Sequence, residues 1–265
     1  MTDFDGLTMY WGSNGGSMAK TLRHMAEPDV MVSYATAHDP WDGASDGDLF
    51  IDSGGYSLML RTGEHDPVDE YLEYVREYGA SVAALQDYPC EPQILQEYDR
   101  TVRDHQEMTV ERAAENLAYI QDHGIDAEPM AVLQGWETSD YLRCIDRFRD
   151  VGVLTDRIGI GSVCRRNATD EIRDVVTTIA DELPDKRLHA FGVKKSILKY
   201  PDVRDVLDSV DSSAWYFGMY QGKPVEEPAW HTTTYKYLEY KRDLYDYFGL
   251  SEQARDGQET IKAWM

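Results

Sequence analysis

Short apolar runs alternate with segments of helical periodicity along most of this 265-residue chain. Eight of the runs are six to eight residues long and have the composition of strands: LTMYWG (7–12), VMVSYA (30–35), DLFIDS (48–53), SVAALQD (81–87), EPMAVLQG (128–135), RIGIGS (157–162), RLHAFGV (187–193) and SVDSSAW (209–215). Strands that alternate with helices are typical of βαβ units, so the pattern predicts a parallel sheet.

The segments between these runs repeat their apolar residues about every 3.6 positions, which predicts helices. One is expected over 68–75, directly after Pro67, and one over 109–123, ending at Gly124. The tyrosine-rich segment 232–248 predicts an amphipathic helix that closes the barrel wall. Two further helices are expected with hydroxyl caps, one from Ser139 through Phe148 and one from Thr169 through Leu183.

Seven or eight strand–helix units favour a closed barrel over an open sheet. The α/β fold that we expect is a single (β/α)8-type TIM barrel, regular or irregular, with a C-terminal closing helix. Such barrels take about 250 residues, so residues 1–265 are predicted to form one domain, without a separate zinc or RNA-binding domain. Functional residues of this fold lie on the loops at the C-terminal ends of the strands.

Several predicted strands end in residues that packing alone does not require. Aspartate is disfavoured inside strands, and each aspartate taken singly can be explained as a cap of the next helix. Three of them at one barrel mouth, however, favour a functional site. The residues at these ends are Asp52 with Gly54, Gly55 and Tyr56; Asp87; Gln134 with Gly135; Gly159, Gly161 and Ser162; and Asp211.

Carboxylates arranged in this way suit the cleavage of an N-glycosidic bond. One carboxylate can stabilise the positive charge that develops at C1′ or attack this atom as a nucleophile. Another carboxylate can transfer the proton of the departing base. A guanine-like base presents N1–H and N2–H₂ donors to an acceptor such as Asp87, and Gln134 can both donate and accept. A glycine backbone N–H can reach O6, and Tyr56 and Phe191 can stack on the ring.

The motifs DSGGY, QG after an apolar strand, IGIGS, HAFGV and VDSSAW occur in the order and spacing of tRNA-guanine transglycosylases, which this sequence resembles over residues 48–217. The resemblance implies that Asp211 is the nucleophile and Asp52 the general acid/base. It also implies that Asp87, Gln134 and Gly161 recognise the base, and that Tyr56 and Phe191 stack on it.

Two departures shift the expected polymer from tRNA to DNA. The tRNA enzymes carry a CxCxxC…His zinc site after the nucleophile strand, whereas here no cysteine follows Cys164. They also carry a C-terminal RNA-binding domain, which we do not expect in this protein. The chain looks more like the zinc-less DpdA-type enzymes. This resemblance implies a pentosyltransferase that replaces guanine in DNA with a 7-deazaguanine, such as the 7-cyano (preQ0) or 7-aminomethyl (preQ1) form, through a covalent aspartyl–sugar intermediate. No cofactor or metal is expected.

Three alternatives stay open from the sequence. The first is a transglycosylase that acts on tRNA with the help of a partner subunit. The second is a hydrolase that removes the base and lets water finish the reaction. The third is a non-catalytic subunit that binds nucleic acid, although retention of all three aspartates argues against it.

The net charge of −23 is unusual for a protein that binds a polyanion. Dense carboxylates with nine lysines resemble proteins of salt-loving organisms, in which salt screens charge over about 3 Å at 1 M; the alternative is an acidic protein that binds no nucleic acid. Basic residues follow two strand ends, and we predict that they contact phosphates: Arg165 and Arg166 after IGIGS, and Lys194 and Lys195 after HAFGV. The alternative is that they are ordinary solvated charges.

Other classes of protein are disfavoured by composition. The three cysteines include no CxxC pair and the seven histidines no HxxxH pair, so neither a disulfide framework nor a metal site is expected. No apolar run reaches the roughly 18 residues that span a bilayer, and the N-terminus lacks the pattern of a signal peptide. We therefore expect a cytoplasmic protein, in the host cytoplasm if the source is viral. The sequence leaves open whether it forms a homodimer.

Overall fold

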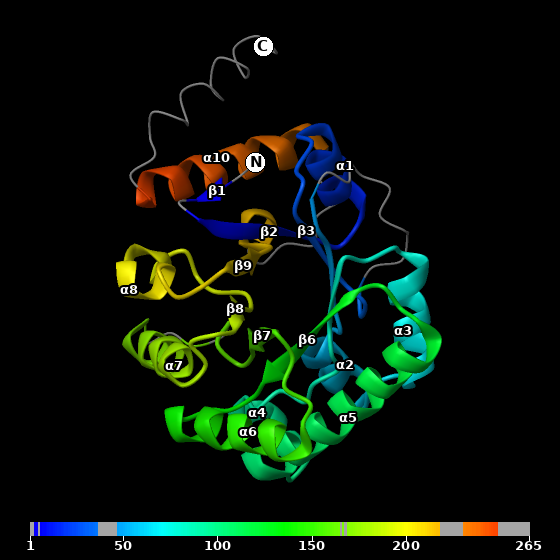
Figure 1. The fold of residues 1–265 in the computed structure, drawn as a ribbon. Coiled ribbons are helices and arrows are strands. Elements are labelled where there is room, and N and C mark those ends of the chain that lie inside the picture. The colour runs from blue at the N-terminus through cyan, green and yellow to red at the C-terminus, as the bar shows by residue number, and fades with distance from the viewer. Residues whose placement is uncertain are drawn as a thin grey trace.

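The computed structural model describes residues 3–4, 6–36, 47–164, 166, 169–217 and 230–248. Eight parallel strands follow one another around a barrel in chain order, and pairing of the first with the last closes the ring (Figure 1). They are β2 (Leu7–Ser13), β3 (Val30–Ser33), β4 (Leu49–Asp52), β5 (Val82–Ala84), β6 (Glu128–Leu133), β7 (Arg157–Ile160), β8 (Arg187–Ala190) and β9 (Ser209–Ser212). A short strand, β1 (Asp3–Phe4), pairs antiparallel with β2. The prediction of an α/β barrel of the TIM type is confirmed.

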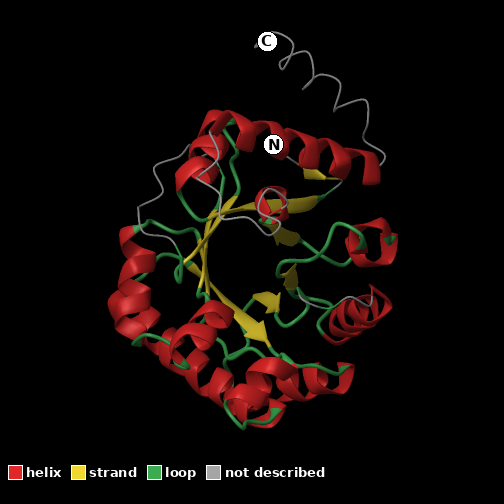
Figure 2. Cartoon of the chain, turned by 180° about the vertical axis from the view of Figure 1, so that it is seen from behind, coloured by secondary structure: helices red, strands yellow, loops and turns green. Residues whose placement is uncertain are grey.

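Helices surround the barrel on the outside, as Figure 2 shows from behind. They are α1 (Gly16–His24), α2 (Gly55–Thr62), α3 (Val68–Glu77), α4 (Pro92–Glu97), α5 (Val102–His123), α6 (Thr138–Val151), α7 (Thr169–Glu182), the 3-10 helix η1 (Ile197–Lys199), α8 (Pro201–Arg204), α9 (Ala214–Phe217) and α10 (Trp230–Tyr247). The tyrosine-rich α10 packs along α1, where Tyr237 and Lys241 both bond to the buried carboxylate of Glu27. None of the helices in the described ranges is long and apolar enough to cross a membrane.

Two helix starts differ from the sequence expectation. Helix α5 begins at Val102, seven residues earlier than predicted, because Thr101 and Asp104 form a capping box. The expected cap of α6 at Ser139 is wrong, since Glu137 is the N-cap and Ser139 lies inside the helix. The side chains of Glu137 and Asp140 satisfy the first backbone N–H groups there, so the serine hydroxyl is not needed. As expected, α3 begins directly after Pro67 and α5 ends directly before Gly124.

The alternation of side chains along each strand explains which residues face the inside of the barrel. Tyr10, Phe50, Val82, Ala84, Met130 and Val132 form a separate apolar cluster there. Residues two positions beyond such inward-facing side chains point the same way, which directs Asp52 and Gln134 toward the barrel mouth. The larger core lies between the strands and the helices. Apolar packing thus fills the lower barrel and leaves the polar strand ends to line the mouth.

Candidate active site

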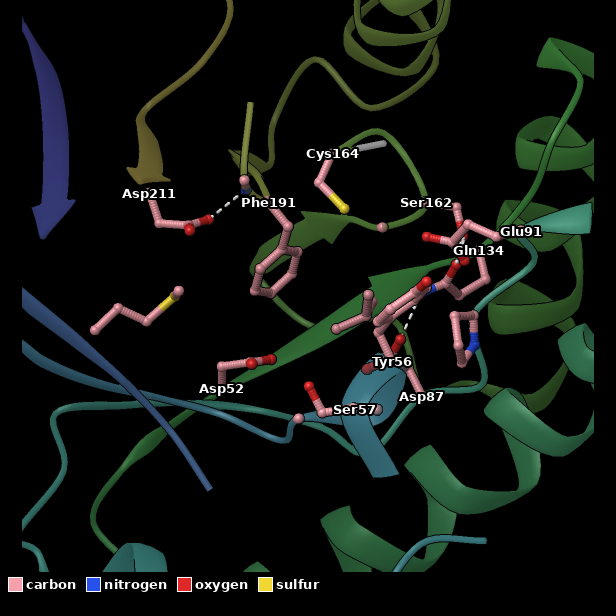
Figure 3. Close-up of a pocket in the computed structure, with 17 residues that line it drawn as sticks. Asp52, Tyr56, Ser57, Asp87, Glu91, Gln134, Ser162, Cys164, Phe191 and Asp211 are labelled. Atoms are coloured by element: carbon pink, nitrogen blue, oxygen red, sulfur yellow. Dashed lines mark hydrogen bonds between the residues drawn. The ribbon is translucent and has the colours of Figure 1, made fainter. Parts of the chain in front are cut away.

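A pocket of about 170 Å³ opens at the C-terminal ends of the strands (Figure 3). It is smaller than the roughly 300–1,000 Å³ of sites for drug-sized ligands, so it suits a single base better than a whole nucleotide. All seven residues predicted to act in catalysis or base binding line it: Asp52, Tyr56, Asp87, Gln134, Gly161, Phe191 and Asp211. Their roles stay predictions, but the structure brings them together from six strand ends.

Asp211, in β9, is buried except toward the pocket, and one of its carboxylate oxygens is held by two donors. Its Oδ1 atom accepts a hydrogen bond from the Gly192 backbone N–H at 2.6 Å and lies 3.3 Å from His189 Nε2. Burial lowers the pKa of His189, which is therefore neutral. Because the Asp211 carboxylate can only accept, the neutral ring carries its proton on Nε2, and Nδ1 accepts from the Ser209 hydroxyl, 2.9 Å away. Oδ2 of Asp211 remains available to the pocket.

Asp52 is the last residue of β4, and its side chain is partly exposed to the pocket. Burial, with a smaller contribution from the negative charge of Asp211, raises the pKa of its carboxyl from 3.8 to about 6. Hydrogen bonds from the Gly54 backbone and the Ser33 side chain oppose this shift in pKa. A carboxyl with this pKa can both hold and release a proton near neutral pH.

Asp87 follows β5 and is almost fully buried at the other end of the pocket. Burial is the main reason that its pKa rises to about 7, and the charge of Asp52 adds to the effect. The Ser53 hydroxyl donates to its Oδ1 at 3.1 Å, and the Gln134 amide donates to its Oδ2. His65 Nε2 lies 2.7 Å from the Asp87 carbonyl oxygen and fixes the backbone of this loop.

Glycines allow the walls of the pocket to approach closely. A Cβ atom on Gly55 would lie 2.5 Å from the Asp87 carbonyl oxygen, and one on Gly161 would lie 2.2 Å from Gln134 Nε2. A Cβ on Gly159 would lie 2.5 Å from the ring of Phe191, so this glycine leaves room for the ring across the barrel mouth. The sequence interpretation of the glycines as points of close approach agrees with these distances.

Glu91 and Cys164 also line the pocket, although the sequence interpretation did not assign them to it. Glu91 precedes Pro92 at the start of α4, so its position in the sequence resembles an ordinary helix cap. Its side chain makes no capping hydrogen bond, is 2% exposed, and accepts from the Ser162 hydroxyl at 2.9 Å. A buried acid at a helix start is not distinguishable from a capping acid in the sequence alone.

None of the predicted phosphate contacts that the structure describes lines the pocket. Arg166 is buried: its guanidinium donates to the Ser162 carbonyl oxygen at 2.9 Å and stacks 4.5 Å from the Trp136 ring centroid. Lys195 Nζ is 2.6 Å from Asp243 of α10, and Lys194 is exposed. Arg165 lies outside the described residues. Phosphate binding by these cations stays a prediction.

Within the described ranges, no group of three or more His, Cys, Asp or Glu side chains is arranged to hold a metal ion. The polar and polarisable groups that line the pocket are carboxylates, an amide, hydroxyls, a thiol, a thioether and aromatic rings.

Comparison with known proteins adds to this geometry. No curated protein matches the sequence. A family model described as DpdA, DeoxyPurine in DNA protein A, matches residues 35–241, which include every residue of the pocket except Met31. The order of strand-end motifs and the family match agree, and the chain belongs to the DpdA family.

Proposed function

We propose that this protein is a DNA-guanine transglycosylase that replaces guanine with a 7-deazaguanine, with Asp211 as the nucleophile. The main observation behind the proposal is that the three aspartates of the pocket lie in two separate groups. Asp211 and Asp52 lie near the ring of Phe191, and Asp87 lies with Gln134 at the other end (Figure 3). The DpdA match supports DNA as the polymer.

The reaction would proceed by double displacement. Oδ2 of Asp211 attacks C1′ of the target nucleotide, and the bond between C1′ and N9 breaks with its electron pair on the guanine. Protonated Asp52 gives its proton to the departing base. A 7-deazaguanine then enters, loses a proton to Asp52, and attacks C1′, which releases the Asp211 carboxylate.

The charges of the two acids are coupled in a way that assists each step. Burial and the negative charge of Asp211 raise the pKa of Asp52 to about 6, so a fraction of the protein carries a proton on Asp52 near neutral pH before the attack. Formation of the ester removes the charge of Asp211, which lowers the pKa of Asp52 and makes it a stronger acid as the base leaves. Release of Asp211 restores the original state.

The size of the pocket requires the target base to leave the DNA stack, at a cost of a few kcal/mol. Asp87 would accept hydrogen bonds from N1–H and N2–H₂ of the base, while Gln134 donates to O6. The aromatic rings of Tyr56 and Phe191, which both line the pocket, would flank the purine.

The test is the exchange of labelled guanine in duplex DNA, single-stranded DNA and tRNA. Asp211→Asn should abolish the covalent protein–DNA adduct and lower exchange by about 10⁴-fold. Asp208→Asn is the matched control, because Asp208 accepts from the Leu188 backbone N–H at 2.8 Å, outside the pocket. Exchange by the Asp211→Asn variant near the wild-type rate would refute the assignment of the nucleophile.

The same assay separates the remaining functions. Exchange in tRNA with both DNAs inert would overturn the assignment of DNA and leave the barrel chemistry in place. Release of guanine at the same rate with and without added 7-deazaguanine, leaving abasic DNA, would identify a hydrolase.

A further inference from the structure

Helix α2 lies on the rim of the pocket, in the connection between β4 and α3. Its first residues, 55–57, line the pocket (Figure 3). Near its end, the Arg61 guanidinium donates to the carbonyl oxygen of Ala35, just beyond β3, at 3.1 Å. Just after the helix, His65 Nε2 lies 2.7 Å from the carbonyl oxygen of Asp87, beyond β5. Both ends of α2 are thus held at the C-terminal ends of strands, so the helix lies at the barrel mouth, while α3 packs against α5 in the outer wall.

One side of α2 is buried, and the other side is exposed and contains a leucine. Leu58 and Met59 are fully buried, whereas Ser57, Leu60 and Arg61 are exposed. These three exposed residues follow the spacing i, i+3 and i+4, so they lie on one face of the helix. The Leu60 side chain is 57% exposed and therefore contributes little of the stability that a buried leucine gives a fold.

The position of Leu60 distinguishes it from other exposed apolar side chains, since single ones are common on protein surfaces. In the part of the chain that the structure describes, the large apolar side chains that are exposed are Leu60, Val151, Tyr235 and Tyr247. Val151 is the last residue of α6, and the two tyrosines belong to α10. Of these helices, only α2 contributes residues to the wall of the pocket.

The distance from the rim to Leu60 matches the spacing of bases in DNA. Ser57 is exposed and lines the pocket, so it marks the rim. Leu60 lies three residues further, which is about 4.5 Å along the helix axis and about 5–6 Å between Cβ atoms. Successive nucleotides of a stacked strand are about 3.4 Å apart. A duplex that delivers a base over this rim therefore has a neighbouring base step at the level of Leu60.

Removal of one base from a duplex creates a space that an apolar side chain can fill. The pocket of about 170 Å³ suits a single base, so the target guanine must leave its pair and its stack. Proteins that distort duplex DNA often insert leucine or another apolar side chain between base steps, which offsets part of the cost of unstacking. In single-stranded DNA no base pair has to open, so such a side chain contributes much less.

We propose that Leu60 enters the base stack of duplex DNA beside the flipped guanine and fills part of the space that this base leaves. Leu60 thus stabilises the flipped state without touching the base in the pocket. The neighbouring Arg61 adds positive charge for the phosphate at the same step, because only one of its five N–H donors bonds to Ala35. This inference rests on the proposed function, since it concerns how the same guanine is taken from the duplex.

The experiment compares exchange of labelled guanine in duplex and single-stranded DNA of one sequence, with the full chain and its Leu60→Ala variant. The substitution removes three apolar carbons, so exchange in the duplex should fall at least about tenfold more than exchange in the single strand. Affinity for free guanine should not account for this difference, and calorimetric titration with guanine measures it. Urea unfolding checks that the variant is folded, which is expected because Leu60 is exposed.

Two further variants separate a wedge in the DNA from a general loss of apolar surface. Val151→Ala is the matched control, since Val151 is 55% exposed and lies at the end of a helix that does not line the pocket; it should leave the ratio of duplex to single-strand exchange unchanged. Leu60→Met keeps an apolar side chain of similar length and should restore most of the exchange in the duplex. The deficit of Leu60→Ala should also shrink when the target guanine lies opposite an abasic site, because no base pair then has to open.

The outcomes distinguish failure of this inference from failure of the proposed function. Equal loss of exchange in both DNAs, or no loss in the duplex, would overturn the role of Leu60 and leave the proposed function standing. A wild type that exchanges guanine in single-stranded DNA but not in the duplex would do the same. A wild type that exchanges guanine in neither DNA would overturn the proposed function, and the inference with it.

Discussion

Replacing Asp87 with asparagine should stabilise the folded protein, and the gain should grow as the pH rises from about 4 to above 7. Asp87 is 8% exposed, and burial raises the pKa of its carboxyl from 3.8 to about 7. Asparagine has nearly the same shape and does not ionise, so it removes the unfavourable buried charge. The same substitution should remove guanine binding, because the acceptor for N1–H and N2–H₂ becomes an amide.

The sign follows from the protons that each state binds. The unfolded chain releases the Asp87 proton near pH 4, whereas the folded state keeps it up to about pH 7. The folded state therefore binds more protons in this window and loses stability as the pH rises through it. A shift in the pKa of Asp87 of about three units, at about 1.4 kcal/mol each, corresponds to about 4 kcal/mol of stability lost by the folded wild type between low and high pH. The hydrogen bonds lost from Ser53 and Gln134 cost about 1 kcal/mol each.

The assay is urea unfolding of the wild type and of Asp87→Asn at pH 5, 6, 7 and 8, at one fixed salt concentration. The difference in free energy of unfolding should favour the variant increasingly with pH and level off near pH 8. Asp126→Asn is the control, since it removes an exposed carboxylate from a loop and should give a difference that hardly depends on pH. A difference for Asp87→Asn that is constant with pH, or that is larger at pH 5 than at pH 8, would refute the reasoning.

Three further outcomes are expected. Gly161→Ala should weaken guanine binding at least tenfold, because the new Cβ would lie 2.2 Å from Gln134 Nε2. It would displace the Gln134 amide from its hydrogen bonds with Ser162 and Asp87, and calorimetric titration with guanine measures the loss. Arg166→Ala should lower the free energy of unfolding by about 2–3 kcal/mol, since it removes a buried, charge-assisted hydrogen bond to the Ser162 carbonyl oxygen. It should weaken binding of free guanine as well as of DNA; loss of DNA binding alone would restore Arg166 as a phosphate contact. Exchange in DNA should rise with salt toward molar concentrations before it falls, because salt first screens the net charge of −23; a steady fall from low salt would contradict this.

The apolar pattern of the sequence was enough to predict the barrel. All eight predicted strands are present, and the helices at Pro67 and Gly124 begin and end as expected. Local sequence is enough to predict these elements, because strand periodicity depends on residues close together in the chain. The helix boundaries depend on the backbone conformations that proline and glycine themselves favour. The convergence of Asp52, Asp87 and Asp211 was also predictable, since parallel strands in a barrel all end on the same rim.

The tertiary structure alone decided how the side chains at this rim are used. Arg166 follows a strand end and resembles a phosphate contact, but packing against Trp136 and Tyr141 of a neighbouring loop and helix buries it. Glu91 resembles a helix cap, but it bonds to Ser162, which is 71 positions away in the chain. The sequence thus determined which residues reach the barrel mouth, because strand alternation is local. It did not determine which of them pair with one another, because hydrogen bonding between distant loops depends on the rotamers and loop paths that only the packed fold selects.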